Sequence, residues 1–200
     1  MSDPKATQPE NFRDLYNKAI ELLARREHSQ AELREKLKRK FECTDADIAQ
    51  VLARLVELGY QCDQRFAVAF TRERLYRGLG ERRIIQELKF KGINASIGEA
   101  ILAEQAQGDF AAAILIERAW RKKFKAIPQD QKERAKQYRF LQYRGFGGDD
   151  ISRLFERLKC MPDDEWWLSL LLHQKSAYDF NNIWVHRRFD VEAKFFKWLN

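Results

Sequence analysis

The apolar positions of this chain recur at the three- and four-residue spacing of amphipathic helices, and one arrangement of them occurs three times. In each copy a basic helical stretch ends at a sharp turn, and a second apolar helix follows at once. A fixed period of roughly fifty residues is typical of an array of like units rather than of one domain around an enclosed cleft. The copies are Leu37–Phe41 followed by Ile48, Leu88–Ile93 followed by Ile97, and Leu141–Phe146 followed by Ile151.

Each copy is predicted to contain three helices. Ser29, with Glu32 three residues later, predicts a capping box, and the next helix is expected to begin near Thr44 or Asp45. Asn94 is predicted to cap the last helix of the second copy. The predicted apolar stripes contain Leu15, Ala19, Leu22, Leu23, Leu33, Leu37, Phe41, Ile48, Val51, Leu52 and Leu55, then Phe66, Ala69, Phe70, Ile84, Ile85, Leu88, Ile97 and Ile101, then Phe110, Ala113, Ile114, Trp120, Phe140, Leu141, Ile151, Leu154, Phe155 and Leu158.

Proline and glycine mark the expected breaks. Residues 10–127 contain no proline and are rich in good helix formers, which favours helix throughout. Glycine is placed where a helix would end in a left-handed residue. The glycines assigned to this role are Gly59, Gly78, Gly80, Gly92, Gly108 and Gly145.

The predicted fold class is therefore all-α, since no window shows the period-two alternation of a half-buried strand. Three tandem three-helix repeats are expected to form an elongated, curved array, because each unit alone is too small to bury its apolar faces. A helical C-terminal extension is expected to follow. The expected ranges are a polar tail at 1–10, repeats at 11–60, 61–107 and 108–159, and an aromatic-rich extension at 160–200.

The net charge of +7 favours an anionic partner, and the charge is unevenly distributed. Residues 63–91 hold eight Lys or Arg against four Asp or Glu, and residues 117–144 hold ten against three. Residues 160–200 hold five against six. The basic character thus belongs to the second and third repeats.

Cysteine usage and the apolar runs indicate where the protein works. Cys43, Cys62 and Cys160 are too few and too scattered for a disulfide framework, which fits a reducing cytoplasm. The N-terminus lacks the apolar core of a signal peptide, and the longest apolar run, 166–172, is too short to cross a bilayer. We expect a cytoplasmic monomer with no membrane contact.

No catalytic or metal-binding pattern is found, so no enzyme activity and no cofactor are expected. The sequence lacks the phosphate-binding, nucleophile-elbow and zinc-helix motifs. The histidines are scattered, and His28 is expected to be a solvated loop residue. Asp149-Asp150 and Asp163–Glu165 are expected to begin helices rather than to bind a metal.

Cationic side chains are the candidates for partner contact, because Arg and Lys facing phosphates give salt-sensitive, sequence-independent affinity. Arg83, Glu87 and Lys91 share a helix face and are expected to neutralise one another in part. Tyr138 and Tyr143 lie among the cations, where they either stack on bases or pack internally. The candidate contact residues are Arg72, Arg74, Arg77, Arg82, Arg83, Arg121, Lys122, Lys123, Lys132, Lys136, Arg139 and Arg144. Arg144 is the weakest of them, since a basic residue before a turn can simply hold helix-end carbonyls.

Three stretches closely resemble the tandem repeats of the RecX family of regulators of the bacterial recombinase RecA. The resemblance covers roughly residues 12–159 and departs from the family's usual pattern in the extension that follows the third repeat. The stretches are LLARREHSQAELREKL at 22–37, DQRFAVAFTRERLYRGLGERRIIQELKFKGI at 63–93, and KQYRFLQYRGFGGDDI at 136–151.

The resemblance implies a negative regulator that binds the RecA filament on single-stranded DNA, blocks filament extension, and depresses ATP hydrolysis and strand exchange. It implies no active-site residues. Two alternatives stay open: a sequence-tolerant nucleic-acid-binding module that acts independently of RecA, and a helical scaffold that recognises an acidic protein. The role of the extension, the choice between capping filament ends and entering the groove, and the repeat that meets RecA are all left undecided by the sequence.

Overall fold

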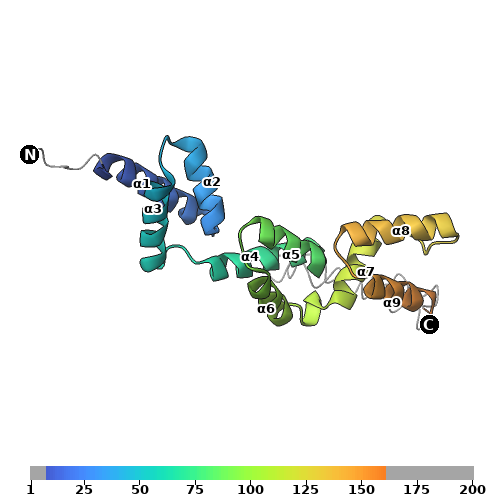
Figure 1. Cartoon of the computed structure of the whole chain (residues 1–200). Coiled ribbons are helices and arrows are strands. Elements are labelled where there is room, and N and C mark those ends of the chain that lie inside the picture. The colour runs from blue at the N-terminus through green and yellow to red at the C-terminus, as the bar shows by residue number, and fades with distance from the viewer. Residues whose placement is uncertain (1–7, 161–200) are drawn as a thin grey trace, which may run out of the picture. The chain divides into compact units, whose positions relative to one another are not determined.

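The computed structural model describes residues 8–160, which form nine α-helices and one 3-10 helix with no strand among them (Figure 1). This confirms the predicted all-α class. The expected helical extension lies outside the described residues, and the first helix begins at Gln8, inside the range expected as a polar tail. The elements are α1 (Gln8–Arg25), α2 (Gln30–Lys40), α3 (Asp45–Glu57), α4 (Asp63–Tyr76), α5 (Glu81–Phe90), α6 (Ala95–Gln105), η1 (Gly108–Phe110), α7 (Ala112–Lys123), α8 (Gln131–Tyr143) and α9 (Gly148–Lys159).

Helices that follow one another in the chain pack together. Helices α1, α2 and α3 contact one another, as do α4, α5 and α6, and α7 packs against α8. We call α1–α3 the first unit, α4–α6 the second unit, and α7–α9 the third unit. The tandem three-helix organisation follows directly from the repeated apolar stripes.

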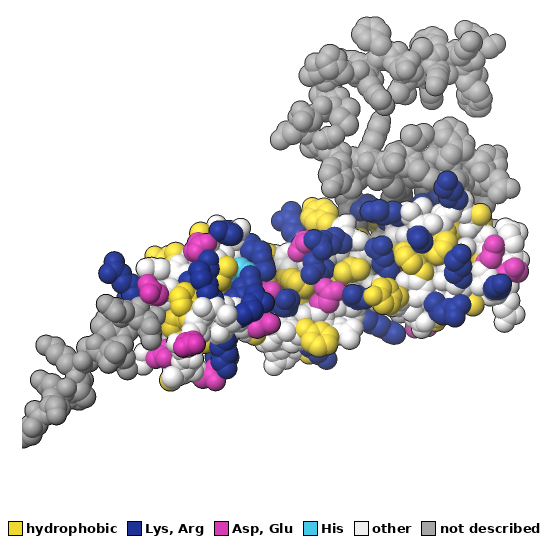
Figure 2. Space-filling model, turned by 90° about the horizontal axis from the view of Figure 1, so that it is seen from above, with side chains coloured by type: hydrophobic (Ala, Val, Ile, Leu, Met, Phe, Trp, Pro, Cys, Tyr) yellow, Lys and Arg dark blue, Asp and Glu magenta, His cyan; other side chains and the backbone are white. Residues whose placement is uncertain are grey.

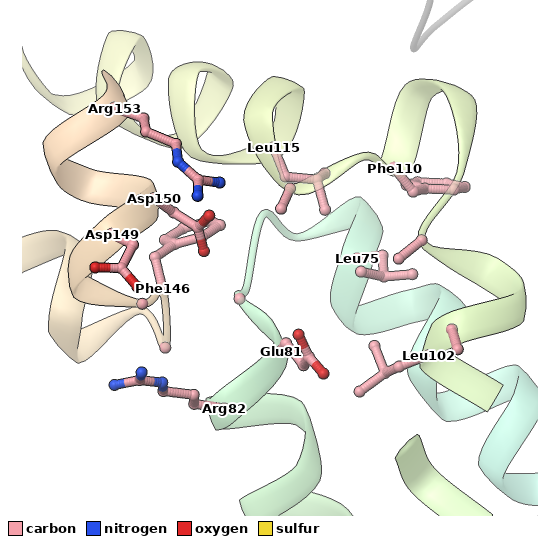
Figure 3. Close-up of a pocket in the computed structure, with 16 residues that line it drawn as sticks. Leu75, Glu81, Arg82, Leu102, Phe110, Leu115, Phe146, Asp149, Asp150 and Arg153 are labelled. Carbon is pink, nitrogen blue, oxygen red and sulfur yellow. The ribbon is translucent and has the colours of Figure 1, made fainter. Parts of the chain in front are cut away.

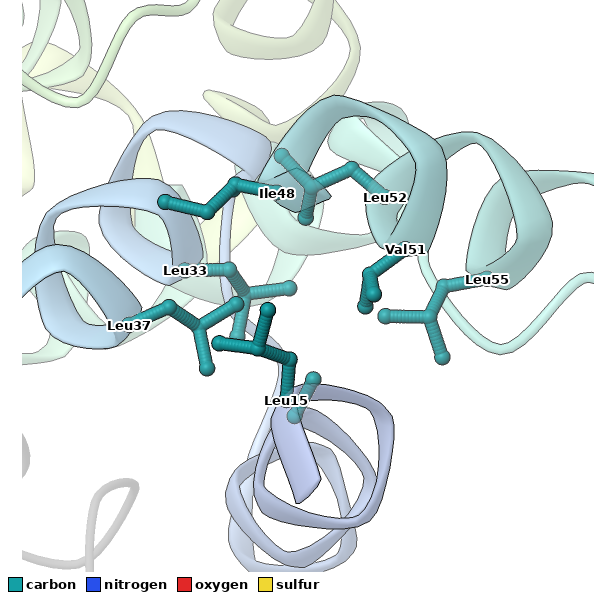
Figure 4. Packing of buried hydrophobic residues seen from close by; sticks show 8 residues of the cluster. Leu15, Leu33, Leu37, Ile48, Val51, Leu52 and Leu55 are labelled. Carbon is teal, nitrogen blue, oxygen red and sulfur yellow. The ribbon is translucent and has the colours of Figure 1, made fainter. Parts of the chain in front are cut away.

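The core of the first unit shows how the stripes work (Figure 4). Leu33 and Leu37 lie one turn apart on α2 and are wholly buried against Leu15 of α1. Helix α3 packs against them with residues at positions i, i+3, i+4 and i+7, which lie on one side of a helix. Burial of each such side chain contributes about 1.5–3 kcal/mol. The α3 residues of this cluster are Ile48, Val51, Leu52 and Leu55.

Two predicted helix caps are confirmed and a third is only half formed. Thr44 and Asp47 form a complete capping box at α3, and the Asn94 side chain accepts a hydrogen bond from the Ser96 amide. Ser29 caps α2 by accepting from the Glu32 amide. The Glu32 side chain, however, does not close the box, because it is engaged in a contact between units.

That contact joins the first unit to the second through a buried carboxylate. Glu32 Oε1 lies 2.7 Å from Nζ of Lys91 at the end of α5, and Glu32 Oε2 lies 3.2 Å from Arg26 Nη1 and 3.0 Å from His28 Nδ1. His28 is 2% exposed, so the expectation of a solvated loop residue is wrong. The pairing with Glu32 compensates its burial.

The loop before α4 completes this contact. The Gln61 side-chain amide donates to the His28 carbonyl at 3.2 Å and to Asp63 Oδ1 at 2.8 Å. The Gln30 amide donates to the same Asp63 oxygen at 2.9 Å. The first and second units are therefore held by side chains that supply most of the hydrogen-bonding atoms.

The second and third units meet instead through their backbones. The Gly80 amide donates to the Arg144 carbonyl at 2.8 Å, and the Arg82 amide donates to the Gly145 carbonyl at 3.2 Å. The carbonyls at the end of α8 thus satisfy free amides at the start of α5, where a helix has unpaired donors. We call this the Gly80–Gly145 contact.

The prediction that Gly80 ends a helix in a left-handed conformation is wrong. Gly80 is the N-cap of α5 with φ of −83°, so its backbone is one that any residue can adopt. Its small size is needed because a Cβ would lie 2.5 Å from the Gly145 carbonyl carbon. Gly145 does have positive φ, and a Cβ there would lie 2.4 Å from the Arg83 Cβ.

No helix within residues 8–160 combines the length and the apolar character that a bilayer crossing requires.

We expect Gly80→Ala to destabilise the protein by about 1–3 kcal/mol, because the added methyl group meets backbone atoms that cannot rotate away. Urea unfolding followed by circular dichroism measures this. The φ of Gly80 is compatible with alanine, so a loss reports the neighbouring backbone and not conformational strain. A variant that unfolds at the wild-type urea concentration would contradict the close approach.

We also expect acid to weaken the contact around Glu32. Burial and the nearby Arg26 lower the pKa of His28 below its usual 6.5. Burial opposes ionisation of Glu32, but hydrogen bonds from Lys91, Arg26 and His28 outweigh it and lower its pKa from 4.5 to about 2. The unfolded chain therefore binds more protons than the folded one, so the protein loses stability as the pH falls. His28 contributes this loss as the pH falls below 6.5, and Glu32 contributes it as the pH falls from 4.5 towards 2.

The measurement is the urea midpoint as a function of pH. His28→Gln should reduce the loss of stability between about pH 7 and about pH 5, and Glu32→Gln should cost about 1–3 kcal/mol at neutral pH by leaving cations unpaired. An unchanged midpoint across that range, or the same pH dependence in His28→Gln, would argue against a role for this cluster.

Candidate functional site

The Gly80–Gly145 contact brings arginines from three helices to one place. The end of α4, the start of α5 and the end of α8 meet there, and a cavity of about 420 Å³ lies between them. We call it the arginine pocket. Its lining residues are Arg74, Arg77, Leu79, Arg83, Glu87, Tyr143 and Arg144. Four of the sequence-predicted contact residues are therefore neighbours, although they come from two different repeats.

Glu87 organises two of these arginines. Arg74 Nε donates to Glu87 Oε2 at 2.6 Å, and Arg83 Nε donates to Oε1 at 2.9 Å. Burial opposes ionisation of Glu87, but the hydrogen bonds from Arg83 and Arg74 outweigh it and lower the pKa of the carboxyl group. The predicted pairing of Arg83 with Glu87 is confirmed, whereas Lys91 of the same face pairs with Glu32.

Arg144 holds a helix end, as the sequence suggested. Its Nη1 donates to the carbonyls of Arg77 at 3.1 Å and Gly78 at 3.5 Å, just after α4. Its guanidinium also lies over the Phe140 ring, 5.1 Å from the centroid. These contacts tie the third unit to the second and give Arg144 a structural role.

Arg77 and Tyr143 form the solvent-facing part of the pocket. The Arg77 side chain is 63% exposed and pairs with Glu73 on the surface of α4. Tyr143 is 74% exposed, with the Arg83 guanidinium 4.9 Å from its ring centroid. Tyr138 differs from Tyr143: it is half-buried, with its hydroxyl 2.9 Å from where a Cβ on Gly148 would lie. The structure thus separates the two tyrosines that sequence left equivalent.

The remaining candidates of the second unit lie outside the arginine pocket. Arg72 is exposed, and its guanidinium lies 5.9 Å from the Tyr76 ring centroid. Arg82 is also exposed, and it lines a second cavity. The five candidate contact residues of the second unit therefore do not form one surface.

The cations of the third unit divide into paired and solvent-facing groups. Arg121 donates from Nε and Nη2 to Glu117 Oε1, one turn earlier, and its side chain is only 9% exposed. This pairing removes Arg121 from the cations that face solvent. The other candidates are exposed, with no ion pair to an acidic residue in the described part of the chain: Lys122, Lys123, Lys132, Lys136 and Arg139.

Figure 2 shows the same mixture on one face of the molecule: Lys and Arg side chains are spread over its described part, with apolar side chains between them.

A second cavity, of about 320 Å³, is lined in part by Gly80 and Gly145 and differs from the arginine pocket in character (Figure 3). Apolar side chains from α4, α6, η1 and α7 form one wall, and α9 contributes Asp149, Asp150 and Arg153, with Asp150 beside Arg153. Glu81 adds a third carboxylate against two arginines. The acidic lining makes this cavity unsuitable for phosphate. The apolar wall consists of Leu75, Leu102, Phe110 and Leu115.

Within residues 8–160, no three His, Cys, Asp or Glu side chains gather in a way that would hold a metal ion.

Sequence reasoning missed two features of this region. The ion pair between Arg74 and Glu87 joins α4 to α5. The two residues are too far apart in the sequence for a helical spacing to predict it. Phe90, the last residue of α5, is 81% exposed although it lies in an apolar-basic helix end. Phe90 follows the buried Leu88 by two residues, and Tyr143 follows the buried Leu141 by two residues. This matching position in two repeats is the sequence signal that pairs the two exposed rings.

These observations define an all-α tandem-repeat protein with a cationic surface. Comparison with known proteins identifies the family. Models of the first, second and third three-helix domains of RecX match residues 16–55, 63–102 and 115–155. The chain belongs to the RecX family of regulatory proteins.

Individual relatives agree. The chain is 47% identical over 136 residues to regulatory protein RecX of Vibrio campbellii, covering 67% of this chain and 84% of that protein. It is 42% identical over 147 residues to regulatory protein RecX of Legionella pneumophila, covering 72% and 94%.

Solved structures show the same fold. The crystal structure of RecX from Lactobacillus salivarius superposes with a TM-score of 0.62 at 20% identity, covering 76% of this chain and 99% of that one. A second crystal structure of a regulatory protein RecX gives 0.66 at 19% identity, covering 80% and 81%.

We expect Arg144→Ala to lower stability by about 1–3 kcal/mol, because it removes charge-assisted hydrogen bonds to the carbonyls of Arg77 and Gly78. Arg139→Ala is the matched control: its exposed side chain donates only to a carbonyl of its own helix, so the change should stay within about 0.5 kcal/mol. Urea midpoints of the two variants decide the matter. Equal midpoints would show that Arg144 does not tie the units together.

Proposed function

We propose that this protein is a negative regulator of RecA. On this proposal it binds the RecA filament on single-stranded DNA, blocks extension of the filament, and inhibits ATP hydrolysis and strand exchange during DNA repair and the SOS response. Membership of the RecX family supports the regulatory role. The solvent-facing cations of α7 and α8 are the single observation that supports an anionic polymer as part of the target.

The physical basis is electrostatic. Lys132, Lys136 and Arg139 lie on α8 at helical spacings of three and four, so they share one side of the helix. Cations so placed displace counterions from phosphates and bind any sequence alike. Because RecA covers single-stranded DNA regularly, a repeat protein with several such cations gains affinity from each unit that engages.

We propose further that the protein acts by binding and not by catalysis, as a monomer in the cytoplasm, and without a cofactor. Its partners on this view are the RecA filament and single-stranded DNA, bound directly or within the filament. The contact residues are proposed to be the solvent-facing candidates of the second and third units. Arg121 and Arg144 are the exceptions, since their ion pair and hydrogen bonds favour a structural role.

A second candidate is a sequence-tolerant nucleic-acid-binding module that acts independently of RecA, which the same solvent-facing cations favour. The two differ in affinity for naked DNA at physiological salt. The independent module requires strong binding, whereas the RecA regulator requires only binding to the filament.

The test is the rate of RecA ATP hydrolysis on single-stranded DNA with substoichiometric protein added. We expect the rate to fall, and we expect the triple variant Lys132→Glu, Lys136→Glu, Arg139→Glu to require at least roughly tenfold more protein for the same inhibition, because reversed charges repel the phosphates.

The control reverses three exposed cations of the first unit, Arg13→Glu, Arg34→Glu and Arg39→Glu, with the same change of net charge. We expect it to inhibit like the wild type. A wild-type protein that leaves the rate unchanged at equimolar concentration would exclude RecA regulation, and equal losses in both triple variants would exclude α8 as the contact.

A further inference from the structure

Tyr143 presents an aromatic ring to solvent in a fixed position. The ring is 74% exposed, yet Arg83 lies over it at 4.9 Å and also donates from Nη1 to the Tyr143 carbonyl at 3.3 Å. Arg83 is itself held by Glu87. The contacts from Glu87 to Arg83 and from Arg83 to Tyr143 therefore orient a ring that is itself little buried.

The cations beside this ring are not all neutralised. Four arginines line the pocket against one glutamate, and Arg74 and Arg83 share that carboxylate. Arg144 is committed to carbonyls. Arg77 is the most exposed of the four ion-paired or carbonyl-bound arginines, and its partner Glu73 lies on the open surface, where such pairs contribute little and exchange readily.

We propose that Tyr143 and the arginine pocket form a subsite for one nucleotide of single-stranded DNA. The base stacks on the free side of the Tyr143 ring, and the neighbouring phosphate lies at the mouth of the pocket against Arg77. This rests on the proposed function, and it assigns direct nucleotide contact to a junction between repeats.

The ring is what favours a nucleotide over an acidic peptide. The carboxylate of an acidic peptide would bind the arginines alone. It would make no favourable contact with the exposed tyrosine ring beside them. Stacking of a base on an aromatic side chain contributes about 1–3 kcal/mol and does not depend on which base it is. A cation on the opposite face of the ring adds a favourable cation–π interaction. The pocket volume, about 420 Å³, lies within the range of small-ligand sites, about 300–1,000 Å³.

Phe90 provides a matched control within the same chain. It is the last residue of α5, as Tyr143 is the last of α8, and it is 81% exposed. It does not line the arginine pocket. Replacing either ring removes a similar exposed apolar surface, but only one of the two rings lies beside the pocket cations.

The experiment measures binding of fluorescein-labelled oligothymidylate to the full-length protein, without RecA, at low salt. Tyr143→Leu should weaken binding roughly fivefold to hundredfold, from the loss of one stacked base. Tyr143→Trp should tighten it, since indole has the larger ring face. Phe90→Leu should bind like the wild type. Circular dichroism checks that each variant is folded.

Two further readouts identify the contacts. Photo-crosslinking with oligonucleotides that carry 5-iodouracil should give an adduct on the peptide that contains Tyr143. Arg77→Gln should reduce the slope of log affinity against log salt by about 0.7, the value for one phosphate of a single strand. Arg34→Gln, an exposed arginine of the first unit, should leave the slope unchanged.

The outcomes separate this inference from the proposed function. If Tyr143→Leu binds oligothymidylate normally but inhibits RecA less, the ring contacts protein and the nucleotide subsite is wrong. Equal losses in Tyr143→Leu and Phe90→Leu, or an adduct elsewhere, also overturn it. If the expected DNA results are obtained while the wild-type protein leaves RecA ATP hydrolysis unchanged, the subsite stands and the RecA role falls.

Discussion

Two glycines from different repeats bring backbone against backbone, and the residues beside them, Leu79, Arg83 and Arg144, line the arginine pocket. The Gly80 amide meets the Arg144 carbonyl at 2.8 Å, and neither Gly80 nor Gly145 has space for a side chain. Because α4, α5 and α8 converge at this contact, Arg74, Arg77, Arg83 and Arg144 become neighbours. The arrangement of charge on this part of the molecule is thus a consequence of a neutral backbone contact.

Counting cations along the chain overstates the surface available to a partner. Arg121 and Arg144 contribute to the positive balance of the third unit, but the first is paired with Glu117 and the second is bound to carbonyls. Arg74 shares Glu87 with Arg83. Of the twelve candidates, Lys122 and Lys123 of α7 and Lys132, Lys136 and Arg139 of α8 are exposed and have no ion pair within residues 8–160, and the proposed role rests mainly on them.

Local pattern was sufficient for the fold and insufficient for the site. The stripe Leu33–Leu37 and the caps at Thr44 and Asn94 follow from helix geometry within a few residues, and they were predicted correctly. His28, by contrast, was expected to be solvated, but it is a buried loop residue: it pairs with Glu32 four residues later, and its surroundings include Lys91 and Gln61 from beyond the first unit. Gly80 was misassigned for the same reason: what restricts it is Gly145, which is sixty-five positions away in the sequence.

The contact around Glu32 and the Gly80–Gly145 contact also differ in the groups that form them. Lys91 reaches Glu32 on a long side chain whose rotamers can adjust, although the neighbouring Gly92 has no space for a Cβ, which would lie 2.7 Å from the Ala31 Cβ. Gly80 and Gly145 have no such reserve, because backbone hydrogen bonds weaken steeply when their geometry changes. We therefore expect the start of α5 and the end of α8 to move together, so that a partner that displaces one of these helix ends also displaces the other.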